Sequence, residues 1–312
     1  MKKTLYILSL LAGAALSSCE HKELCYDHAH AGFVRVVFDW TGCPGVAPEG
    51  MRVLFYPTDG GVRITEDIAG CTGGFVDVPP GQYDVICFNN DTEAVSWRGE
   101  SSPATLEVYT GSSAIDGGMA YGAAPPQAGD PNEVIRRPPD PLWGCRQNGV
   151  RVLSGNGVEN VITLSPGQVT RHVTWEMSEV TNSENITMVR AALSGISGSY
   201  FMGTAAPCQE RSAFAFDGTV APDDAKRLNG RFEFFGCPTD SECRHLLTIY
   251  CWSPYGNVMK SFDVTEQLHG ATDPYNIHLV IDGLIEIPAG GEDDGFDPDV
   301  DGWDDQQEDI IM

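Results

Sequence analysis

The stretch GGFVDVPPGQYDVICFNN, residues 73–90, carries the clearest strand pattern in the chain. Residues 75–78 and 82–88 are rich in β-branched and aromatic side chains, which favour extended backbone. The residues between them, PPG, are typical of a turn. The stretch therefore predicts two strands joined as an antiparallel hairpin.

The same pattern of short strands and turns extends over the rest of the chain. The 312 residues include 35 Gly and 20 Pro, and the aromatic and β-branched residues fall in short runs. In the run FVRVVFDW, Val34, Val36 and Phe38 alternate with a mixed set, so one face of this strand is predicted to be buried. The composition and the spacing together predict an all-β protein.

Two tandem β-sandwiches are predicted, separated by a connector and followed by a tail. The first sandwich spans residues 32–122, and the connector, residues 123–147, is rich in Pro and Gly, which disfavour a helix or a central strand. The second sandwich spans residues 148–288, where the strand pattern restarts at NVITLSPGQVTRHVTWEM. Only APDDAKRL, residues 221–228, resembles a short helix. Residues 289–312 form an acidic tail.

Residues 1–18 have the features of a bacterial signal peptide. Two lysines precede an apolar run of twelve residues, which is too short to span a bilayer. Two serines then precede Cys19, as in the lipobox of bacterial lipoproteins. We expect cleavage before Cys19 and acylation of its thiol, which would anchor the protein in the outer membrane, with residues 19–31 as a polar stalk. The alternative is an ordinary secretory signal with a cysteine near its cleavage site.

The charge of the chain is strongly negative and concentrated near its end. A formal net charge of −25 disfavours binding to nucleic acid or to anionic lipid headgroups. Ten acidic residues lie between positions 292 and 309, and DPDVDGWDDQQE there matches a calcium-loop pattern. The calcium ligands would be Asp297, Asp299, Asp301, Trp303, Asp305 and Glu308.

Two other interpretations of the tail stay open. It could be a solvated acidic segment that repels other acidic surfaces. It could also be a terminal strand that docks on a sheet edge, because a solvated segment has little use for large apolar residues. The anchors of such a strand would be Phe296, Val300, Trp303, Ile310 and Ile311.

The chain has ten cysteines, Cys19 included, and a compartment outside the cytoplasm permits disulfides. Cys237 and Cys243 flank a short loop and are the predicted disulfide, although together with His245 they could instead bind zinc. Cys87 and Cys251 lie in strand-like runs and are predicted to be small buried hydrophobes.

The polar stalk holds another candidate metal site, for zinc or copper. Its ligands would be His21, Cys25, His28 and His30. The alternative is a plain polar stalk, because nothing in the sequence fixes the conformation of this segment. No cofactor is predicted beyond the lipid on Cys19 and the candidate calcium ion.

The sequence contains no G-x-S-x-G elbow, no H-E-x-x-H pair and no phosphate-binding loop, so a non-enzymatic protein is predicted. Besides the membrane, its partners would be other envelope proteins, bound through a sheet edge. The alternative partner is a surface glycan held by aromatic side chains, which could equally pack in a core. The candidate aromatic residues are Trp97, Trp143, Trp252 and Tyr255.

Several segments of the chain resemble a known family. They are CEHKELCYDHAH, the NNDTE that follows PPGQYDV, PDPLWG and VRAALSGISGSYF. Together they resemble an uncharacterised lipoprotein family of the Bacteroidales, related to fimbrillin-type proteins that include the anchor and minor subunits of fimbriae. The resemblance implies two transthyretin-like β-sandwich domains in tandem, a place on the outer membrane, and adhesion or fimbria-like assembly without enzyme activity.

Overall fold

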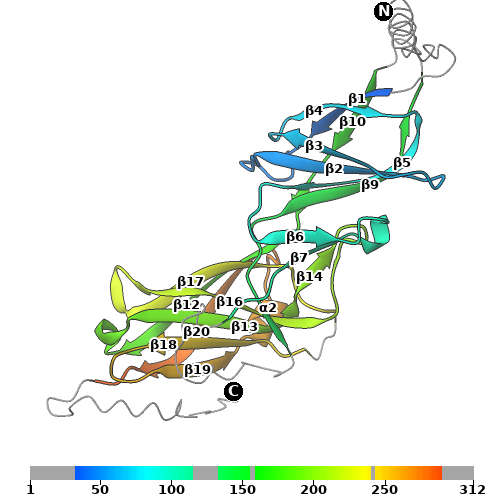
Figure 1. Ribbon diagram of the computed structural model, residues 1–312. Helices are drawn as coiled ribbons and strands as arrows, with labels where there is room; N and C mark the ends of the chain where they lie inside the picture. The colour runs from blue at the N-terminus through cyan, green and yellow to red at the C-terminus, as the bar shows by residue number, and fades with distance from the viewer. Residues whose placement is uncertain (1–31, 115–132, 155–158, 240–242, 290–312) are drawn as a thin grey trace, which may run out of the picture.

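The computed structural model describes residues 32–114, 133–154, 159–239 and 243–289, whose regular structure is almost entirely β-strand (Figure 1). Within these residues the strands form sheets of three, five, eight and four strands. The predicted all-β class is confirmed. In the same residues, no helix has the length and apolar character needed to cross a membrane.

The first sandwich consists of two facing sheets at the N-terminal end of the molecule (Figure 1). Its strands are β1 (Gly32–Phe38), β2 (Gly50–Pro57), β3 (Ile64–Ala69), β4 (Gly73–Val78), β5 (Gly81–Asn89), β9 (Trp143–Val152), β10 (Asn160–Leu164) and β11 (Gly167–Gln168). The three-stranded sheet β10-β1-β4 packs against the five-stranded sheet β11-β9-β5-β2-β3. Val34, Val36 and Phe38 point into the core between the sheets, as the alternation in β1 predicts.

The hairpin predicted for residues 73–90 is wrong, although both of its strands form. β4 pairs with β1, whereas β5 pairs with β2 and β9 in the facing sheet, so the turn crosses from one sheet to the other. Pro79 and Pro80 have no N–H group with which to close a tight hairpin. The hydroxyl of Tyr83 donates to the carbonyl of Pro79 at 2.8 Å, which holds the crossing segment against β5.

A small sheet lies between the first sandwich and the rest of the molecule (Figure 1). It has the order β15-β14-β7-β6, from β6 (Val95–Arg98), β7 (Glu107–Thr110), β14 (Ser199–Phe201) and β15 (Ala206–Pro207); the short 3-10 helix η1 (Pro103–Thr105) precedes β7. Leu54, Ile86 and Phe88 of the first sandwich share a buried cluster with Leu106 and Val108. β2 and β5 are therefore buried on both faces, which explains why their sequences read as apolar runs.

The remaining strands form one strongly curved sheet. They are β8 (Val134–Arg136), β12 (Arg171–Thr181), β13 (Met188–Ser197), β16 (Arg211–Ala221), β17 (Asp224–Phe234), β18 (Leu246–Trp252), β19 (Val258–Asp263) and β20 (Asn276–Glu286). The order is β19-β18-β13-β16-β17-β12-β20, with β8 pairing with β16. The short helices η2 (Ser183–Asn185) and α2 (Thr265–His269) lie in its connections.

Trp175 of β12 organises the core of the curved sheet. Its side chain is 1% exposed, and its ring lies over Gly218 of β16 and Gly230 of β17, which are register partners. A Cβ atom at Gly230 would lie 2.5 Å from Trp175 Nε1, and one at Gly218 would lie 2.9 Å from Cζ2. The two glycines therefore make room for the indole, and the indole covers backbone that glycine leaves bare.

The helix predicted for residues 221–228 is wrong. These residues are the last residue of β16, a two-residue turn and the start of β17, with Ala221 opposite Asp224. The backbone N–H of Lys226 donates to the Asp224 carboxylate at 3.0 Å, a local bond that competes with helix formation. Among the described residues, the α-helix that forms is α2, which no pattern predicted.

Two strands, β9, which begins inside the predicted connector, and β10, which follows it, pair with strands of the first sandwich. β9 is antiparallel to β5, and β10 is parallel to β1. The chain therefore leaves the first sandwich, forms β6, β7 and β8, of which β8 joins the curved sheet, and returns to the first sandwich before β12 begins. The boundaries at residues 122 and 148 remain predictions, because strand pairing does not show which parts fold independently.

Candidate functional site

The curved sheet ends in two strands that each have a ladder partner on one side. β19 pairs with β18, and β20 pairs with β12. The sheet curls until these end strands approach each other, and a Cβ atom at Gly283 of β20 would lie 2.7 Å from the ring of Phe262 of β19. In the part of the chain that the structure describes, no ladder joins β19 to β20. We call this junction, formed by β19, α2 and β20, the seam.

Side chains take the place of a neighbouring strand along the seam. The amide of Gln267, in α2, donates to the carbonyl of Val280 and accepts from its N–H, both at 2.9 Å. The ammonium of Lys260, in β19, donates to the carbonyl of Leu284 at 3.2 Å. These backbone groups of β20 thus have the partners that a further strand would supply.

A cavity of about 440 Å³ opens beside the seam. Its lining includes Phe262, Asp263, Gln267, Val280 and Ile281, from β19, α2 and β20. Nearby, the side chains of Val280 and Leu284 are 43% and 38% exposed on the outside of β20. The seam therefore combines an edge strand, a small cavity and exposed apolar side chains, which are the elements that strand addition uses.

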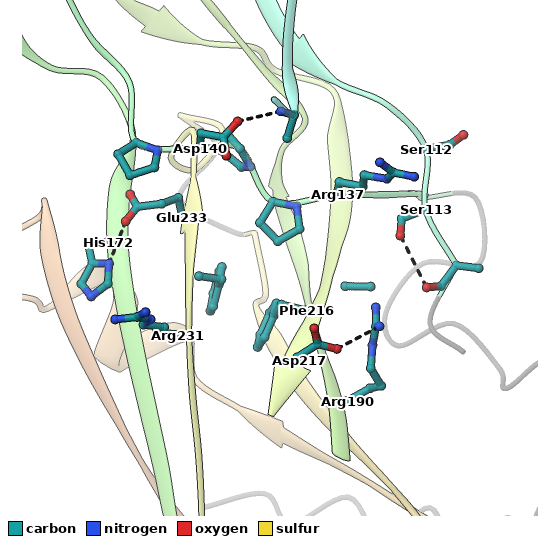
Figure 2. A pocket seen from close by; sticks show the side chains of 17 residues that line it. Ser112, Ser113, Arg137, Asp140, His172, Arg190, Phe216, Asp217, Arg231 and Glu233 are labelled. Atoms are coloured by element: carbon teal, nitrogen blue, oxygen red, sulfur yellow. Dashed lines mark hydrogen bonds and ion pairs between the residues drawn. The ribbon is translucent and has the colours of Figure 1, made fainter. Parts of the chain in front are cut away.

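A larger cavity, of about 1160 Å³, lies between the connector and the curved sheet (Figure 2). Residues 112–114 and 137–141 form one wall, and β12, β13, β16 and β17 form the other. Its charged groups are largely engaged with the protein. The Asp140 carboxylate accepts from the backbone N–H groups of Glu93 and Ala94 at 2.8 and 2.6 Å, and Arg190 pairs with Asp217 at 2.9 Å.

His172 and Glu233 form the most buried polar pair of this cavity. Nδ1 of His172 lies 2.7 Å from Oε1 of Glu233, across β12 and β17 where the two residues are register partners. Burial raises the pKa of the Glu233 carboxyl, and the nearby His172 only partly opposes this shift. The pair braces two central strands and thus has a structural role that requires no substrate.

The outer face of the three-stranded sheet carries exposed aromatic residues. Phe33 and Phe75 are each 70% exposed, and Val161 is 51% exposed. Arg35, between them, is the register partner of both Phe75 and Val161. Exposed apolar groups of this kind, gathered on one sheet face, are typical of a contact surface.

Several residues of the predicted sites lie outside the described residues. They include Cys19, the stalk ligands His21, Cys25, His28 and His30, and the tail residues from Phe296 to Ile311. The predictions of lipid attachment, of a stalk metal site, and of calcium binding or strand docking by the tail therefore stay predictions.

The predicted disulfide and zinc residues lie in the curved-sheet region. Cys237 and Cys243 are present as thiols, and Sγ of Cys243 donates to the carbonyl of Gly195 at 3.0 Å. The disulfide between them stays a prediction. His245 is fully buried. Its ring belongs to a group of possible metal ligands with Cys237 and His269, and Cys243 is not in that group. His269 lies 24 residues from His245, so no short spacing in the sequence points to it as a ligand.

Three of the candidate glycan-binding aromatics differ in their exposure. Trp252 is 1% exposed in β18, and Trp97 packs partly buried against the core with Arg52 above its ring. Tyr255 is 54% exposed, on the turn after β18. Among the described residues, these three side chains therefore form no shared platform.

Part of this chain is similar in sequence to a known protein. A putative fimbrium anchoring subunit, Fim4B, from Bacteroides ovatus is 37% identical over 113 residues, which are 36% of this chain and 34% of the relative. The match thus spans about a third of that relative's length.

Two solved structures share the fold. A putative adhesin from Bacteroides ovatus has a TM-score of 0.63 and 21% identity, over 84% of this chain and 94% of the other. The fimbrial anchor protein Mfa2 from Porphyromonas gingivalis has a TM-score of 0.50 and 15% identity, over 80% and 90%. A family described as a domain of unknown function, DUF5119, matches residues 18–217. The resemblance seen in the sequence is confirmed, and the chain belongs to the DUF5119 family.

Proposed function

We propose that this protein is a non-enzymatic, lipid-anchored subunit of the outer membrane, which holds fimbrial or adhesive partner proteins through a sheet edge. The relative named as a fimbrium anchoring subunit and the shared fold with a fimbrial anchor support the fimbrial partner. The lipobox at Cys19 supports attachment to the membrane. Two transthyretin-like domains in tandem belong to the same proposal, supported by the resemblance in sequence.

The observation that carries the proposal is the seam. The outward N–H and C=O of Val280 are bonded to a side chain, which an incoming strand can replace with equivalent hydrogen bonds. The seam also lies in the curved sheet, at the far end of the molecule from β1 (Figure 1). A lipid attached a short distance before β1 would leave this end of the molecule pointing away from the membrane.

The test is co-purification of the lipidated protein with its neighbours after crosslinking in intact cells. We expect Val280→Lys with Leu284→Lys to abolish capture of a fimbrial subunit, because two charges on β20 oppose strand addition. The matched control is Val62→Lys, since Val62 is 88% exposed and lies outside the seam. Capture that survives the β20 changes, or that is lost instead with Phe33→Ser and Phe75→Ser, would overturn the assignment to the seam.

Anchoring is tested separately. Radiolabelled palmitate should enter the wild-type chain and not Cys19→Ser, and the variant should leave the membrane fraction. A wild-type chain that takes up no palmitate would contradict lipid attachment and would leave the proposed role of the seam unaffected.

The alternative partner, a surface glycan, has less support from the geometry. A glycan platform needs exposed aromatic faces side by side, and Trp252 is buried. Glycan arrays with the purified chain distinguish the two functions, because a glycan-binding protein would bind the array when no partner protein is present.

A further inference from the structure

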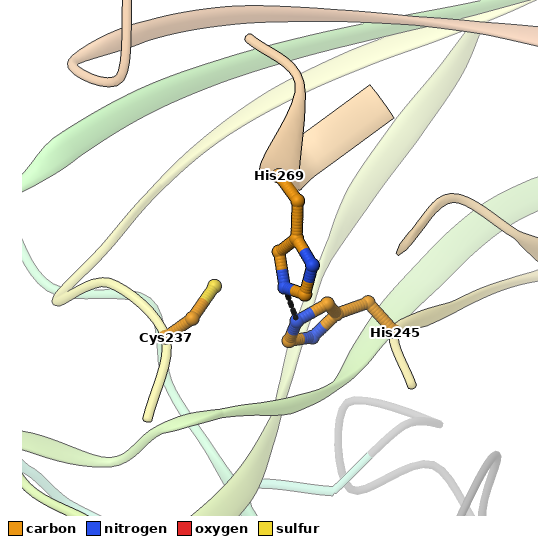
Figure 3. A group of neighbouring side chains, drawn as sticks. All are labelled: Cys237, His245 and His269. Atoms are coloured by element: carbon orange, nitrogen blue, oxygen red, sulfur yellow. Dashed lines mark hydrogen bonds between the residues drawn. The ribbon is translucent and has the colours of Figure 1, made fainter. Parts of the chain in front are cut away.

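Three metal-binding side chains converge beside the seam, and none of the three lines either of the two cavities described above. Cys237 follows β17, His245 immediately precedes β18, and His269 is the last residue of α2. The thiol sulfur and one ring nitrogen of each histidine all lie within 4.8 Å of one another. Figure 3 shows the Cys237 thiol and the His269 ring both turned toward His245.

The two histidines face each other through the same kind of atom. Nε2 of His245 lies 3.0 Å from Nε2 of His269, with the ring planes at 83°. Nδ1 of His245 lies 3.4 Å from the carbonyl of Ser194, a contact in which the ring donates. The donor at Nδ1 leaves the lone pair on Nε2, so that it faces the centre of the cluster. Metal-binding histidines are commonly oriented by this kind of bond on their other nitrogen.

Two hydrogen bonds hold the backbone of His245 in place. Its N–H donates to the hydroxyl of Thr265 at 2.9 Å, and its carbonyl accepts from the N–H of Val264 at 3.0 Å. Gly195 permits this close approach, because it has a φ of +76° and a Cβ atom there would lie 2.2 Å from the carbonyl of Arg244. The backbone of His245 is thus fixed before any ligand binds, which lowers the entropy lost on binding.

We propose that Cys237, His245 and His269 bind one Zn²⁺ ion. The thiol loses its proton to solvent as the Zn–S bond forms, and each imidazole donates a lone pair without changing charge. Zn–N bonds of about 2.0 Å and a Zn–S bond of about 2.3 Å place neighbouring ligand atoms roughly 3.3–3.7 Å apart in a tetrahedron. The separations found here need only small side-chain adjustments to reach these values. Water would complete the tetrahedron on the side of His269, which is exposed.

The bound ion would join three segments of the chain: the end of β17, the start of β18 and the end of α2. The site excludes the disulfide predicted between Cys237 and Cys243, because a sulfur in a disulfide cannot act as a thiolate ligand. The zinc site and the disulfide are therefore alternative states of the same loop.

The experiment uses the full chain, reduced and stripped of metal, with His21, Cys25, His28 and His30 replaced so that the stalk cannot bind the ion. Zinc chloride alone is titrated by calorimetry. We expect one equivalent to bind, and His269→Ala and Cys237→Ser each to weaken binding at least tenfold. Matched controls are His172→Ala and Cys71→Ser, which remove a histidine and a cysteine outside the cluster.

Cobalt(II) provides a second readout. Its complex should absorb through sulfur-to-metal charge transfer in the wild-type cluster and lose that band in Cys237→Ser. Circular dichroism of each metal-free variant checks the fold, and His269, which is exposed, is the position least expected to disturb it. Equal zinc binding by wild type and His269→Ala would overturn the proposal, as would a Cys237–Cys243 disulfide in protein isolated from its own envelope.

Discussion

Cys87 of β5 and Cys145 of β9 are register partners in the first sandwich, and their sulfur atoms lie 3.3 Å apart. Cys87 is fully buried, whereas Cys145 is partly exposed. The hydrogen bond between the thiols lowers the pKa of Cys145, while the same bond and burial raise the pKa of Cys87. Cys145 is therefore the thiol that reacts first with an external oxidant.

We predict that a low-molecular-weight disulfide, such as oxidised glutathione, converts this pair into a cross-strand disulfide. The Cys145 thiolate attacks the oxidant and releases one thiol, and Cys87 then displaces the second thiol, which leaves a Cys87–Cys145 bond. Directly opposed strand residues have Cα separations that suit such a bond. Peptide mapping without reductant should find this disulfide. The free energy of unfolding should rise by about 2–4 kcal/mol.

Cys251 provides the internal control for this oxidation. Burial raises its pKa to about 12, and it should remain a thiol under the same conditions. Cys145→Ser should leave Cys87 unoxidised. Alkylation of both Cys87 and Cys145 after prolonged exposure to the oxidant would contradict the prediction.

Gly230→Ala should destabilise the curved sheet. The added Cβ atom would lie 2.5 Å from Trp175 Nε1, so the indole or β17 must shift. We expect the free energy of unfolding to fall by about 1–3 kcal/mol, as is usual for overpacking. Chemical denaturation measures the change. Gly111→Ala is the control, because no atom lies within 4 Å of its Cβ position, and equal stability of the two variants would disprove the role of the indole.

Gln267→Ala should expose the edge of β20. The variant loses both hydrogen bonds to Val280, and we expect a loss of roughly 1–2 kcal/mol in the free energy of unfolding. It should also self-associate more than wild type, because the freed N–H and C=O can pair with another chain. Thermal melts and sedimentation velocity measure the two effects. Gln147→Ala, an exposed glutamine in β9, should change neither.

Glu233→Gln should stabilise the protein at neutral pH. Because the folded-state pKa of Glu233 is raised, the folded protein takes up this proton at a higher pH than the unfolded chain does. The free energy of unfolding therefore falls as pH rises through that window, and above the folded pKa the buried charge destabilises the fold in full. Glutamine removes the charge, so the melting temperature of the variant should exceed that of wild type.

The difference in melting temperature should shrink as pH falls through the folded pKa of Glu233, where the wild-type carboxyl becomes neutral. Asp77→Asn, at an exposed position in β4, is the control and should show no such pH-dependent gain. A variant less stable than wild type at neutral pH would mean that the bond to His172 outweighs the effect of burial.

The sequence by itself determined where many of the strands lie and which of their faces are buried. Val34, Val36 and Phe38 point inward as their alternation predicts, and Cys87 and Cys251 are buried as their apolar surroundings predict. These properties are local, because side chains of a strand alternate between two faces and an apolar set must leave water. The lipobox and the family resemblance are also readable from short segments alone.

Only the tertiary structure decided which strands pair. The PPG turn crosses between sheets instead of closing a hairpin, and β10 joins β1 although more than a hundred residues separate them. The meeting of Cys87 with Cys145, and of His245 with His269, follows from those pairings. Backbone hydrogen bonds are the same for every strand, so the choice of partner depends on how whole sheets pack, and no local pattern records it.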